Sequence, residues 1–537
     1  MTSSRIAAAV SVLIVIIVVG AHPAYADTAP PDSEFVAVPT STPTSDQGDI
    51  EPTPLEDAES SSPDSPASAE PPGAPEESES VPTAPDPLAS GPMPEVVVTG
   101  DDAVAPGAEV VDIAAAGVPE DIVIAALPPT ASDSALIAWI GTDAEPVTKL
   151  TLQAALNSAP PDGTVQLVPS PSGYRFASVL VVPSAVHISA ATLTTIYGRL
   201  TLAGTGLSTS EVSLSPAANG QTVLTISASG ASVSDLDIAN PESFTGTTGI
   251  AVGAGLPGVV LSRIAIDGTA TGINLSTSTG VTIADSTITR VATGITASAS
   301  SAQRGPEIDR TTVEFTSRGI LLGATTEAHL STVSLTGPGL GTTYAIDYQS
   351  ATAIEIVDVN ISSALHGIST SILTATGIGP SISGGSITVT GTGIGLAATI
   401  GATITGTTLT RVEPTNNAVA VGINVLNASS VTITDVVATG FREGILVAPA
   451  NTASGPSISG GRIAAVVSGI ALGGSTAPRI TGVILDGQLR PAATVIATVG
   501  VELASSTSAS IDGLTVNNVA RGINAPTTNT AAGPTIT

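Results

Sequence analysis

The chain of 537 residues contains no cysteine and few aromatic residues. Without cysteine it has no disulfide framework, no thiolate metal site and no thiol for lipid attachment. Aromatic side chains make up 2% of the sequence, with a single tryptophan, so the flat aromatic surfaces that often contact ligands are scarce. Stability must therefore come from buried aliphatic side chains and from backbone pairing.

Basic residues are also scarce. The sequence has 15 Lys and Arg against 45 Asp and Glu, a net charge of −30. Residues 27–148 hold 25 acidic residues and no Lys or Arg, whereas residues 149–537 hold 20 acidic and 14 basic residues. Because a nucleic-acid-binding protein needs basic groups to neutralise phosphates, this composition excludes nucleic acid as a partner.

The one long apolar run lies near the N-terminus. Arg5 precedes apolar and small residues from Ile6 to Ala21, and Ala24-Tyr25-Ala26 follows. This order is typical of a secretory signal peptide with an A-x-A cleavage site. We expect residues 1–26 to be removed and the mature chain, without a membrane span, to be secreted, extracellular or on the cell surface. An uncleaved anchor is the alternative.

Two segments follow that lack a regular pattern. Residues 27–95 are rich in Pro, Ser, Thr, Ala and acidic residues, a composition that buries too little surface to fold and that like charges extend. We interpret them as a disordered acidic stalk, a solvated spacer rather than a cation-binding tail. Residues 96–148 form a connector of unclear structure, with candidate strands at 96–98, 122–124 and 135–140.

Residues 149–537 repeat with a long period. The phrase Gly-Pro-x-Ile recurs at intervals of 74, 76 and 78 residues, beginning at Gly305, Gly379, Gly455 and Gly533. Gly-Ile, or a close relative, divides each period into three turns of 22–31 residues. Short apolar alternations such as Val281-Thr282-Ile283 predict brief strands separated by Gly, Ser, Asp and Asn turns. A fixed period of this kind predicts a solenoid of stacked units.

Thr279–Ile288, running on to Thr293-Gly294-Ile295, resembles the short repeats of the right-handed parallel β-helix proteins, the pectate-lyase-like superfamily of secreted bacterial type. Leu150–Leu156 followed by Asp162–Leu167 is similar to that family's capping helix and first strand. The resemblance implies an all-β fold for residues 149–537, a right-handed parallel β-helix of about 14 turns. It implies little about function, since the family includes lyases, hydrolases, esterases, phage spikes and non-catalytic surface proteins.

Acidic residues are the catalytic candidates that this resemblance implies. Its lyases use carboxylates to hold Ca²⁺ and an Arg or Lys to abstract a proton, and its hydrolases use two or three Asp. The turns share a frame, apolar-x-X-x-x-apolar, whose third position is Asp in some turns, Gly in others and Arg or Thr in the rest. This exchange suits either a bend with positive φ or an Asx-type hydrogen bond. The occupants of the third position are Asp235, Arg263, Asp285, Arg310, Thr332, Asp358, Gly384, Gly406, Asp435, Gly460, Gly482 and Gly513.

One patch remains a candidate site. Asp235, Arg263, Asp285 and Arg310 hold the third position on four consecutive turns, about 5 Å apart if each turn adds one strand. They form either a surface ion-pair ladder or a lyase-like site for a sugar acid or cation, with Arg263 as base or substrate clamp. Calcium is expected only in the second case, and the sequence otherwise predicts no metal site and no cofactor.

Two further surface features suggest ligands. Tyr344 and Tyr348 flank Asp347 and either contact carbohydrate or pack over a bulge. Hydroxyl pairs that flank the last apolar residue of the frame suggest an ice-binding surface, although the turns concerned are not adjacent; these pairs are Thr287/Thr289 and Thr408/Thr410.

The sequence favours a non-catalytic, surface-displayed module that contacts extracellular polysaccharide or a host or cell-envelope surface. A polysaccharide lyase or glycoside hydrolase that acts on acidic glycans in the solenoid groove is the alternative, and an ice-binding solenoid is the third reading. The fourth Gly-Pro-x-Ile repeat breaks off at Thr537 without a cap. Because open solenoid ends invite aggregation, we expect the chain to be a fragment of a longer reading frame.

Overall fold

A computed structural model describes residues 137–138, 148–149, 151–298, 303–339, 341–371, 377–412, 420–448, 454–488, 498–525 and 533–537, with only the backbone at 137–138 and 148–149. All of them belong to one compact unit, Ala114–Thr537. The expected signal peptide, the acidic stalk and the candidate strands at 96–98 and 122–124 lie outside the described residues. Those interpretations stay predictions.

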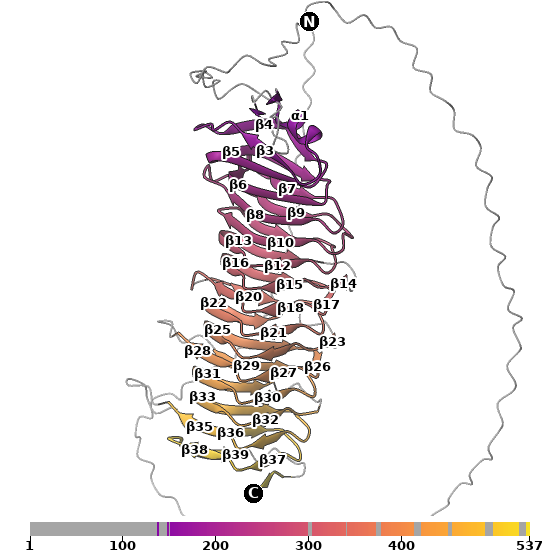
Figure 1. Cartoon of the computed structure of the whole chain (residues 1–537). Helices are drawn as coiled ribbons and strands as arrows, with labels where there is room; N and C mark the ends of the chain where they lie inside the picture. Colours follow the sequence, from indigo (N-terminus) through magenta and orange to yellow (C-terminus); the bar gives the residue numbers. More distant parts are fainter. Residues whose placement is uncertain are drawn as a thin grey trace, which may run out of the picture. The chain divides into compact units, whose positions relative to one another are not determined.

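The chain enters the solenoid through a short helix, as the sequence predicted. Helix α1 (Leu152–Ser158) begins after Thr151, whose hydroxyl accepts a hydrogen bond from the backbone N–H of Ala154 at 3.1 Å. A threonine in this position satisfies one of the free N–H groups at a helix start. Leu152, Ala155 and Leu156 are buried in the core, so α1 closes the N-terminal end of the stack (Figure 1).

The first solenoid strand, β3 (Gly163–Leu167), follows α1 and lies where the sequence predicted it. On one side it pairs in parallel with β5 (Val186–Leu202). On the other side Leu167 pairs with Ile137 of β1 (Ile137–Ala138), an antiparallel strand that also pairs with β2 (Thr148–Lys149). A strand therefore does form within 135–140, and it covers part of the edge of β3 that would otherwise be open.

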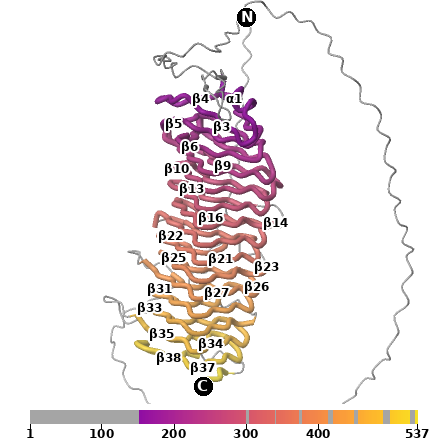
Figure 2. Tube along the Cα trace, in the orientation of Figure 1, coloured from indigo at the N-terminus to yellow at the C-terminus, as the bar shows by residue number. Residues whose placement is uncertain are grey.

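Strands of successive turns stack in parallel and form three faces (Figures 1 and 2). In the described residues the first face begins with β3, β5 and β6 (Gly206–Ser215) and continues as thirteen strands: β8 (Ser232–Ala239), β10 (Val260–Asp267), β12 (Thr282–Ala284), β15 (Glu307–Asp309), β18 (His329–Ser331), β21 (Glu355–Val357), β24 (Ser381–Ser383), β27 (Thr403–Thr405), β30 (Thr432–Thr434), β32 (Ser457–Ser459), β34 (Arg479–Thr481), β37 (Ser510–Asp512) and β40 (Thr535–Ile536).

The second face continues β8 and β10 beyond a corner and adds β13 (Thr287–Ala297), β16 (Thr312–Leu322), β19 (Ser334–Thr336), β22 (Asn360–Ser369), β25 (Ser386–Ala397), β28 (Thr408–Arg411), β31 (Val437–Val447), β33 (Arg462–Gly473), β35 (Ile484–Gly487) and β38 (Thr515–Asn517). The longer of these strands bend into the third face through a register shift, as β13 does against β16.

The third face also contains β4 (Tyr174–Val182), β7 (Thr222–Ile226), β9 (Thr248–Val252), β11 (Thr271–Asn274), β20 (Tyr344–Asp347), β29 (Val421–Leu426), β36 (Val499–Ala504) and β39 (Arg521–Asn524). Two short parallel pairs stand apart from the main sheet: β14 (Gln303–Arg304) with β17 (Thr325–Thr326), and β23 (Gly377–Ile378) with β26 (Thr399–Ile400). The predicted fold class, an all-β parallel solenoid, is confirmed with about 13 turns.

Apolar residues of the frame point inward and form continuous columns. In β12, Ile283 is fully buried while Thr282 and Ala284 are part-exposed, the alternation expected of a strand with one buried face. Ile283 lies in register between Leu261 and Ile308. Burying such a side chain contributes about 1.5–3 kcal/mol, so these columns stabilise every turn in the same way.

The recurring Gly-Ile phrase marks a close approach between turns on the third face. A Cβ on Gly272 would lie 2.6 Å from the carbonyl oxygen of Gly294 in the next turn, and a Cβ on Gly249 would lie 2.7 Å from that of Gly272. Glycine is thus required by backbone packing. The isoleucine that follows, such as Ile273, is fully buried.

Candidate functional site

The third position of the frame forms the corner between the first and second faces. All twelve of its occupants have positive φ, from 42° at Arg310 to 65° at Gly384. A residue with a Cβ pays about 1–2 kcal/mol in this conformation, which explains why glycine recurs there. The interpretation of this position as a backbone bend is confirmed.

Two corner aspartates bind an arginine one turn later. Arg263 donates to Asp235 from Nε at 2.5 Å and from Nη2 at 2.8 Å. Arg310 donates to Asp285 from Nε at 2.6 Å and from Nη2 at 3.0 Å. Of the two readings, the geometry fits the surface ion-pair ladder, although the four residues form two separate bidentate pairs rather than one continuous row.

The other two corner aspartates are followed by glycine. Asp358 precedes the corner of Gly384, and Asp435 precedes that of Gly460. A Cβ on either glycine would collide with Oδ1 of the aspartate in the turn before it. A corner aspartate therefore leans over the next corner, which holds either a cationic partner or no side chain at all.

The bidentate pairs keep their members charged. The hydrogen bond from Arg263 lowers the pKa of Asp235, and the bond from Arg310 lowers the pKa of Asp285. Conversely, the bond to Asp235 raises the pKa of Arg263. A general acid or base works best when its pKa lies near the working pH, so all three pKa values are displaced away from proton-transfer chemistry.

The structure separates the three residues of the predicted carbohydrate contact. Tyr348 is 1% exposed, donates its hydroxyl to the carbonyl oxygen of Gly395 at 2.7 Å and has a pKa raised by burial. Asp347 is fully buried. Tyr344 alone is part-exposed, with its ring stacked on His366 at a centroid distance of 4.6 Å. The prediction is corrected for Asp347 and Tyr348, because neither side chain faces solvent.

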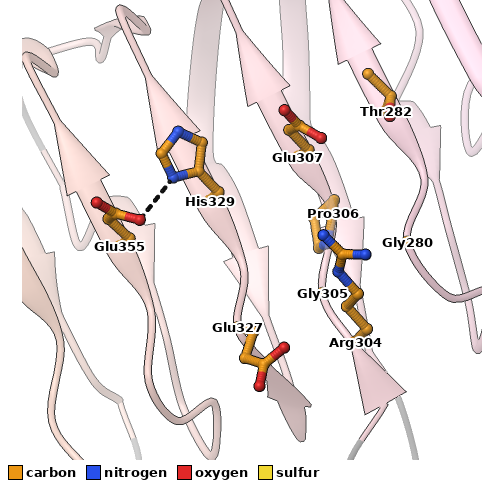
Figure 3. Close-up of a pocket in the computed structure, with 9 residues that line it drawn as sticks. All are labelled: Gly280, Thr282, Arg304, Gly305, Pro306, Glu307, Glu327, His329 and Glu355. Carbon is orange, nitrogen blue, oxygen red and sulfur yellow. Dashed lines mark hydrogen bonds and ion pairs between the residues drawn. The ribbon is translucent and has the colours of Figure 1, made fainter.

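A cavity on the first face was not predicted. It is an open cavity of about 440 Å³ lined by Gly280, Thr282, Arg304, Gly305, Pro306, Glu307, Glu327, His329 and Glu355 (Figure 3). Glu307, His329 and Glu355 occupy one register position on β15, β18 and β21. Nδ1 of His329 lies 3.1 Å from Oε2 of Glu355. We call these three strands the charged segment.

The sequence does carry this row of side chains. Each member directly precedes the first apolar residue of the frame, a column whose other occupants from β8 to β37 are Ser232, Val260, Thr282, Ser381, Thr403, Thr432, Ser457, Arg479 and Ser510. Comparing turns at this column, and not only at the corner, would have shown three ionisable residues on consecutive turns.

Beyond the charged segment, the first face becomes a surface of hydroxyl groups. On β24, β27, β30 and β32, which we call the hydroxyl segment, both outward positions carry Ser or Thr in register; they are Ser381, Ser383, Thr403, Thr405, Thr432, Thr434, Ser457 and Ser459. The hydroxyl pairs proposed from the sequence, Thr287/Thr289 and Thr408/Thr410, lie instead on the second face, on β13 and β28.

Across the described ranges, no group of three or more His, Asp or Glu is arranged to hold a metal ion. No helix in this part of the chain is long and apolar enough to cross a membrane. Calcium, which the sequence implied only for a lyase, stays a prediction.

Stacked parallel strands, inward aliphatic columns and corners with positive φ define a parallel β-solenoid, the fold that the resemblance predicted. No protein-family model and no curated protein sequence matches the chain.

Solved structures of this class are similar to it. An N-terminal fragment of bacteriophage phi29 gene product 12 is 15% identical over 70% of this chain and 69% of its own, with a TM-score of 0.45. The catalytic unit of a GH87 alpha-1,3-glucanase from Streptomyces thermodiastaticus is 13% identical over 69% and 65%, with a TM-score of 0.33. The mannuronan C-5 epimerase A-module of Azotobacter vinelandii is 15% identical over 72% and 94%, with a TM-score of 0.34. At these identities the likeness concerns the fold alone.

Proposed function

We propose that the chain is a non-catalytic β-helix module that contacts a polysaccharide through its first face. The observation that carries this proposal is the pairing of Asp235 with Arg263 and of Asp285 with Arg310. A lyase base must give up its own proton before it can take one, but the bond to Asp235 raises the pKa of Arg263. A general acid must hold a proton, but the pKa values of both aspartates are lowered. These residues are already engaged in ion pairs at the exposed corner of the solenoid.

The cavity on the charged segment supports a binding role. Glu307, His329 and Glu355 stand in one column and so reach a ligand from the same side, whereas a glycosidase places its two carboxyl groups around the scissile bond. Hydrogen-bonding groups about 4.8 Å apart on adjacent strands suit successive hydroxyls of a chain laid along the solenoid axis.

The charges around the cavity indicate which glycans fit. The lining includes three glutamates, one arginine and one histidine. An acidic lining repels acidic polymers and attracts groups of the opposite sign. We therefore expect a neutral or amine-bearing glycan to bind there in preference to an acidic one.

The full chain should be incubated with polygalacturonate, a neutral β-glucan and chitosan oligosaccharides, with and without Ca²⁺. We expect binding of the neutral or amine-bearing glycan and no new reducing or unsaturated ends. Glu307→Gln and Glu355→Gln should weaken binding, whereas Glu314→Gln, an exposed glutamate on β16, should not. Release of new ends would overturn the non-catalytic role and favour the lyase or hydrolase alternative.

The same proposal places the module outside the cell, as a secreted or surface-displayed protein. Its support is the sequence order of Arg5, the apolar run Ile6–Ala21 and the Ala24-Tyr25-Ala26 motif. N-terminal sequencing of the exported protein should begin at Asp27. Retention of Met1 on the exported chain would contradict cleavage.

The hydroxyl segment favours a second candidate function, ice binding. Its eight Ser and Thr side chains form a grid of about 4.8 Å between strands and about 6.6 Å along each strand. Threonine has few χ1 rotamers, so its hydroxyl stays near one position. Such a grid favours an ordered layer of water over a disordered one.

Ice recrystallisation in the presence of the full chain tests this second function. We expect slowed crystal growth that is lost in Thr405→Lys, on the first face, and kept in Thr410→Lys, on the second face of the same turn. If Thr410→Lys alone abolishes the effect, the active surface is the one proposed from the sequence. No effect of the unmodified chain would exclude the function.

A further inference from the structure

Three side chains interrupt a column of threonines on the third face. The residue before the Gly-Ile phrase is threonine in the two preceding turns and in the one that follows, at Thr271, Thr293 and Thr392. Three consecutive turns carry instead Arg318 on β16, Tyr344 on β20 and His366 on β22, paired in register. Adjacent strands are about 4.8 Å apart, so the three groups form one short row.

A fully buried carboxylate orients the first member of the row. Nε of Arg318 donates to Oδ2 of Asp347 at 3.1 Å, and Asp347 has no exposed surface. The same carboxylate accepts bonds from the backbone N–H of Ser371 at 3.0 Å, from its hydroxyl at 2.9 Å and from Nε2 of Gln349 at 3.3 Å. With four donors around it, Asp347 is saturated and acts to position Arg318.

Each member of the row has a polar group without a hydrogen-bond partner among the described residues. Arg318 uses only Nε, so its two terminal nitrogens are free to donate, and its side chain is 36% exposed. The Tyr344 hydroxyl makes no hydrogen bond with a described residue, and Nδ1 of His366 is buried without one. Burial raises the pKa of Tyr344 and lowers the pKa of His366, which keeps Tyr344 protonated and His366 uncharged near neutral pH.

We propose that Arg318, Tyr344 and His366 form a binding site for an oxyanion, a carboxylate or a sulfate. Arginine presents a planar fork of N–H donors that fits two oxygens of such a group. Tyr344, one strand away, donates its hydroxyl to the same group, and His366 holds the Tyr344 ring in place by stacking, with 23° between the ring planes. Asp347, the nearest carboxylate, already accepts four hydrogen bonds and cannot accept another from a ligand. The row therefore offers chiefly hydrogen-bond donors, and its ligand must be a hydrogen-bond acceptor.

This inference rests on the proposed function, since it takes a glycan as the molecule that carries the oxyanion. It adds a second contact with the polysaccharide, on the third face, that binds anionic groups. The lining of the first-face cavity includes three glutamates and one arginine, whereas the third-face row presents a guanidinium and a phenol. An anionic residue of a polysaccharide would therefore bind the third face and be disfavoured in the cavity.

Calorimetric titration of the full chain tests the site with sodium galacturonate, sodium sulfate and galactose. Galacturonate should bind at least about tenfold more tightly than galactose, which has the same ring but lacks the carboxylate. Sulfate binding as tight as that of galacturonate would identify a site for free oxyanions, and selective galacturonate binding would identify a glycan-borne one. Equal affinity for galactose and galacturonate would overturn the proposal.

Substitutions separate the row from the rest of the surface. Tyr344→Phe removes one donor and keeps the stacked ring, so it should weaken galacturonate binding about 3- to 10-fold. Arg318→Lys keeps a charge near Asp347 but loses the fork, and the loss should be larger. Arg290→Lys is the matched control, because Arg290 on β13 is an exposed arginine paired with Asp267, and it should change nothing. Unchanged affinity in both row variants would refute the site.

The outcome is independent of the first-face proposal. Glu307→Gln should leave galacturonate affinity unchanged while it weakens the neutral or amine-bearing glycan. If the cavity variants have no effect on any glycan but Tyr344→Phe weakens galacturonate, the first-face contact fails and the oxyanion site stands. The reverse pattern removes the oxyanion site and keeps the cavity.

Discussion

The charged segment and the hydroxyl segment occupy the same face of the same solenoid, yet they present different chemistry. Their inward residues are alike, for example Ile308 on β15 and Ile404 on β27, both fully buried. Their outward residues differ in kind, with Glu307, His329 and Glu355 on one segment and serines and threonines on the other. The interior column sets the fold and leaves the outward columns free to diverge, so function has to be sought in the outward columns.

Corners show the same contrast. In the early turns a corner aspartate is followed by arginine, as Asp235 is by Arg263. In the later turns it is followed by glycine, as Asp435 is by Gly460. One backbone conformation therefore accommodates two solutions to the same crowding, a bidentate ion pair and an absent side chain.

The largest expected effect removes the interior that both segments share. Ile308→Ala and Ile404→Ala each delete a fully buried side chain and should each cost about 2–5 kcal/mol, since a solenoid wall collapses poorly around a cavity. Hydrogen exchange of the neighbouring turns is the measurement, because stacked repeats open locally. Thr405→Ala, on the surface, should change little. A large cost in one segment and none in the other would contradict a common interior.

The next largest effect compares glycine-to-alanine substitutions at a corner crowded by an aspartate and at an open corner. Gly384 and Gly406 have nearly the same φ, 65° and 64°, but a Cβ at Gly384 meets Asp358 whereas one at Gly406 meets nothing within 4 Å. Gly406→Ala should cost about 1–2 kcal/mol for its backbone conformation alone. Gly384→Ala should cost more, measured as the shift in the urea unfolding midpoint.

The double variant Asp358→Gly with Gly384→Ala isolates the collision. It removes the carboxylate that the new methyl group would meet, so its cost should fall back toward that of Gly406→Ala. If the double variant is no more stable than Gly384→Ala, the corner glycine is explained by backbone conformation without crowding.

Much of the fold could be predicted from the sequence because its causes are local and repeated. The frame predicted the buried columns, and the exchange of Asp and Gly at one position predicted a positive-φ corner, which Asp285 and Gly406 both adopt. The short helix after Thr151 was predicted as well. Each of these features depends on residues within a single turn.

The candidate sites were harder to predict because their contacts join different turns. Arg318 and Asp347 are 29 residues apart, and Asp347 and Ser371 are 24 apart, so no local pattern shows that Asp347 is buried and saturated. Tyr348 looks like a surface aromatic in the sequence, but its hydroxyl reaches Gly395 two turns away. The cavity depends on Glu307, which directly precedes the first apolar residue of the frame. The sequence comparison of the turns covered the third position of the frame, so it did not include Glu307.

The smallest expected effect concerns the corner ion pairs. Asp235→Asn keeps a residue that tolerates positive φ and removes the charge that Arg263 binds, so it should abolish a small, salt-screened contribution of the pair. The pKa of Asp235 is lowered in the folded chain. The contribution of the ion pair to stability is therefore present above the ordinary carboxyl pKa and is lost as the pH falls from about 5 toward 2.

Asp435→Asn is the control, since glycine occupies the corner that follows Asp435. In low salt the unfolding midpoint of Asp235→Asn should lie below that of the unmodified chain, and in high salt the two midpoints should converge. The difference between Asp435→Asn and the unmodified chain should be the same at both salt concentrations. Equal salt dependence of both variants would mean that the arginine corners and the glycine corners differ in shape alone.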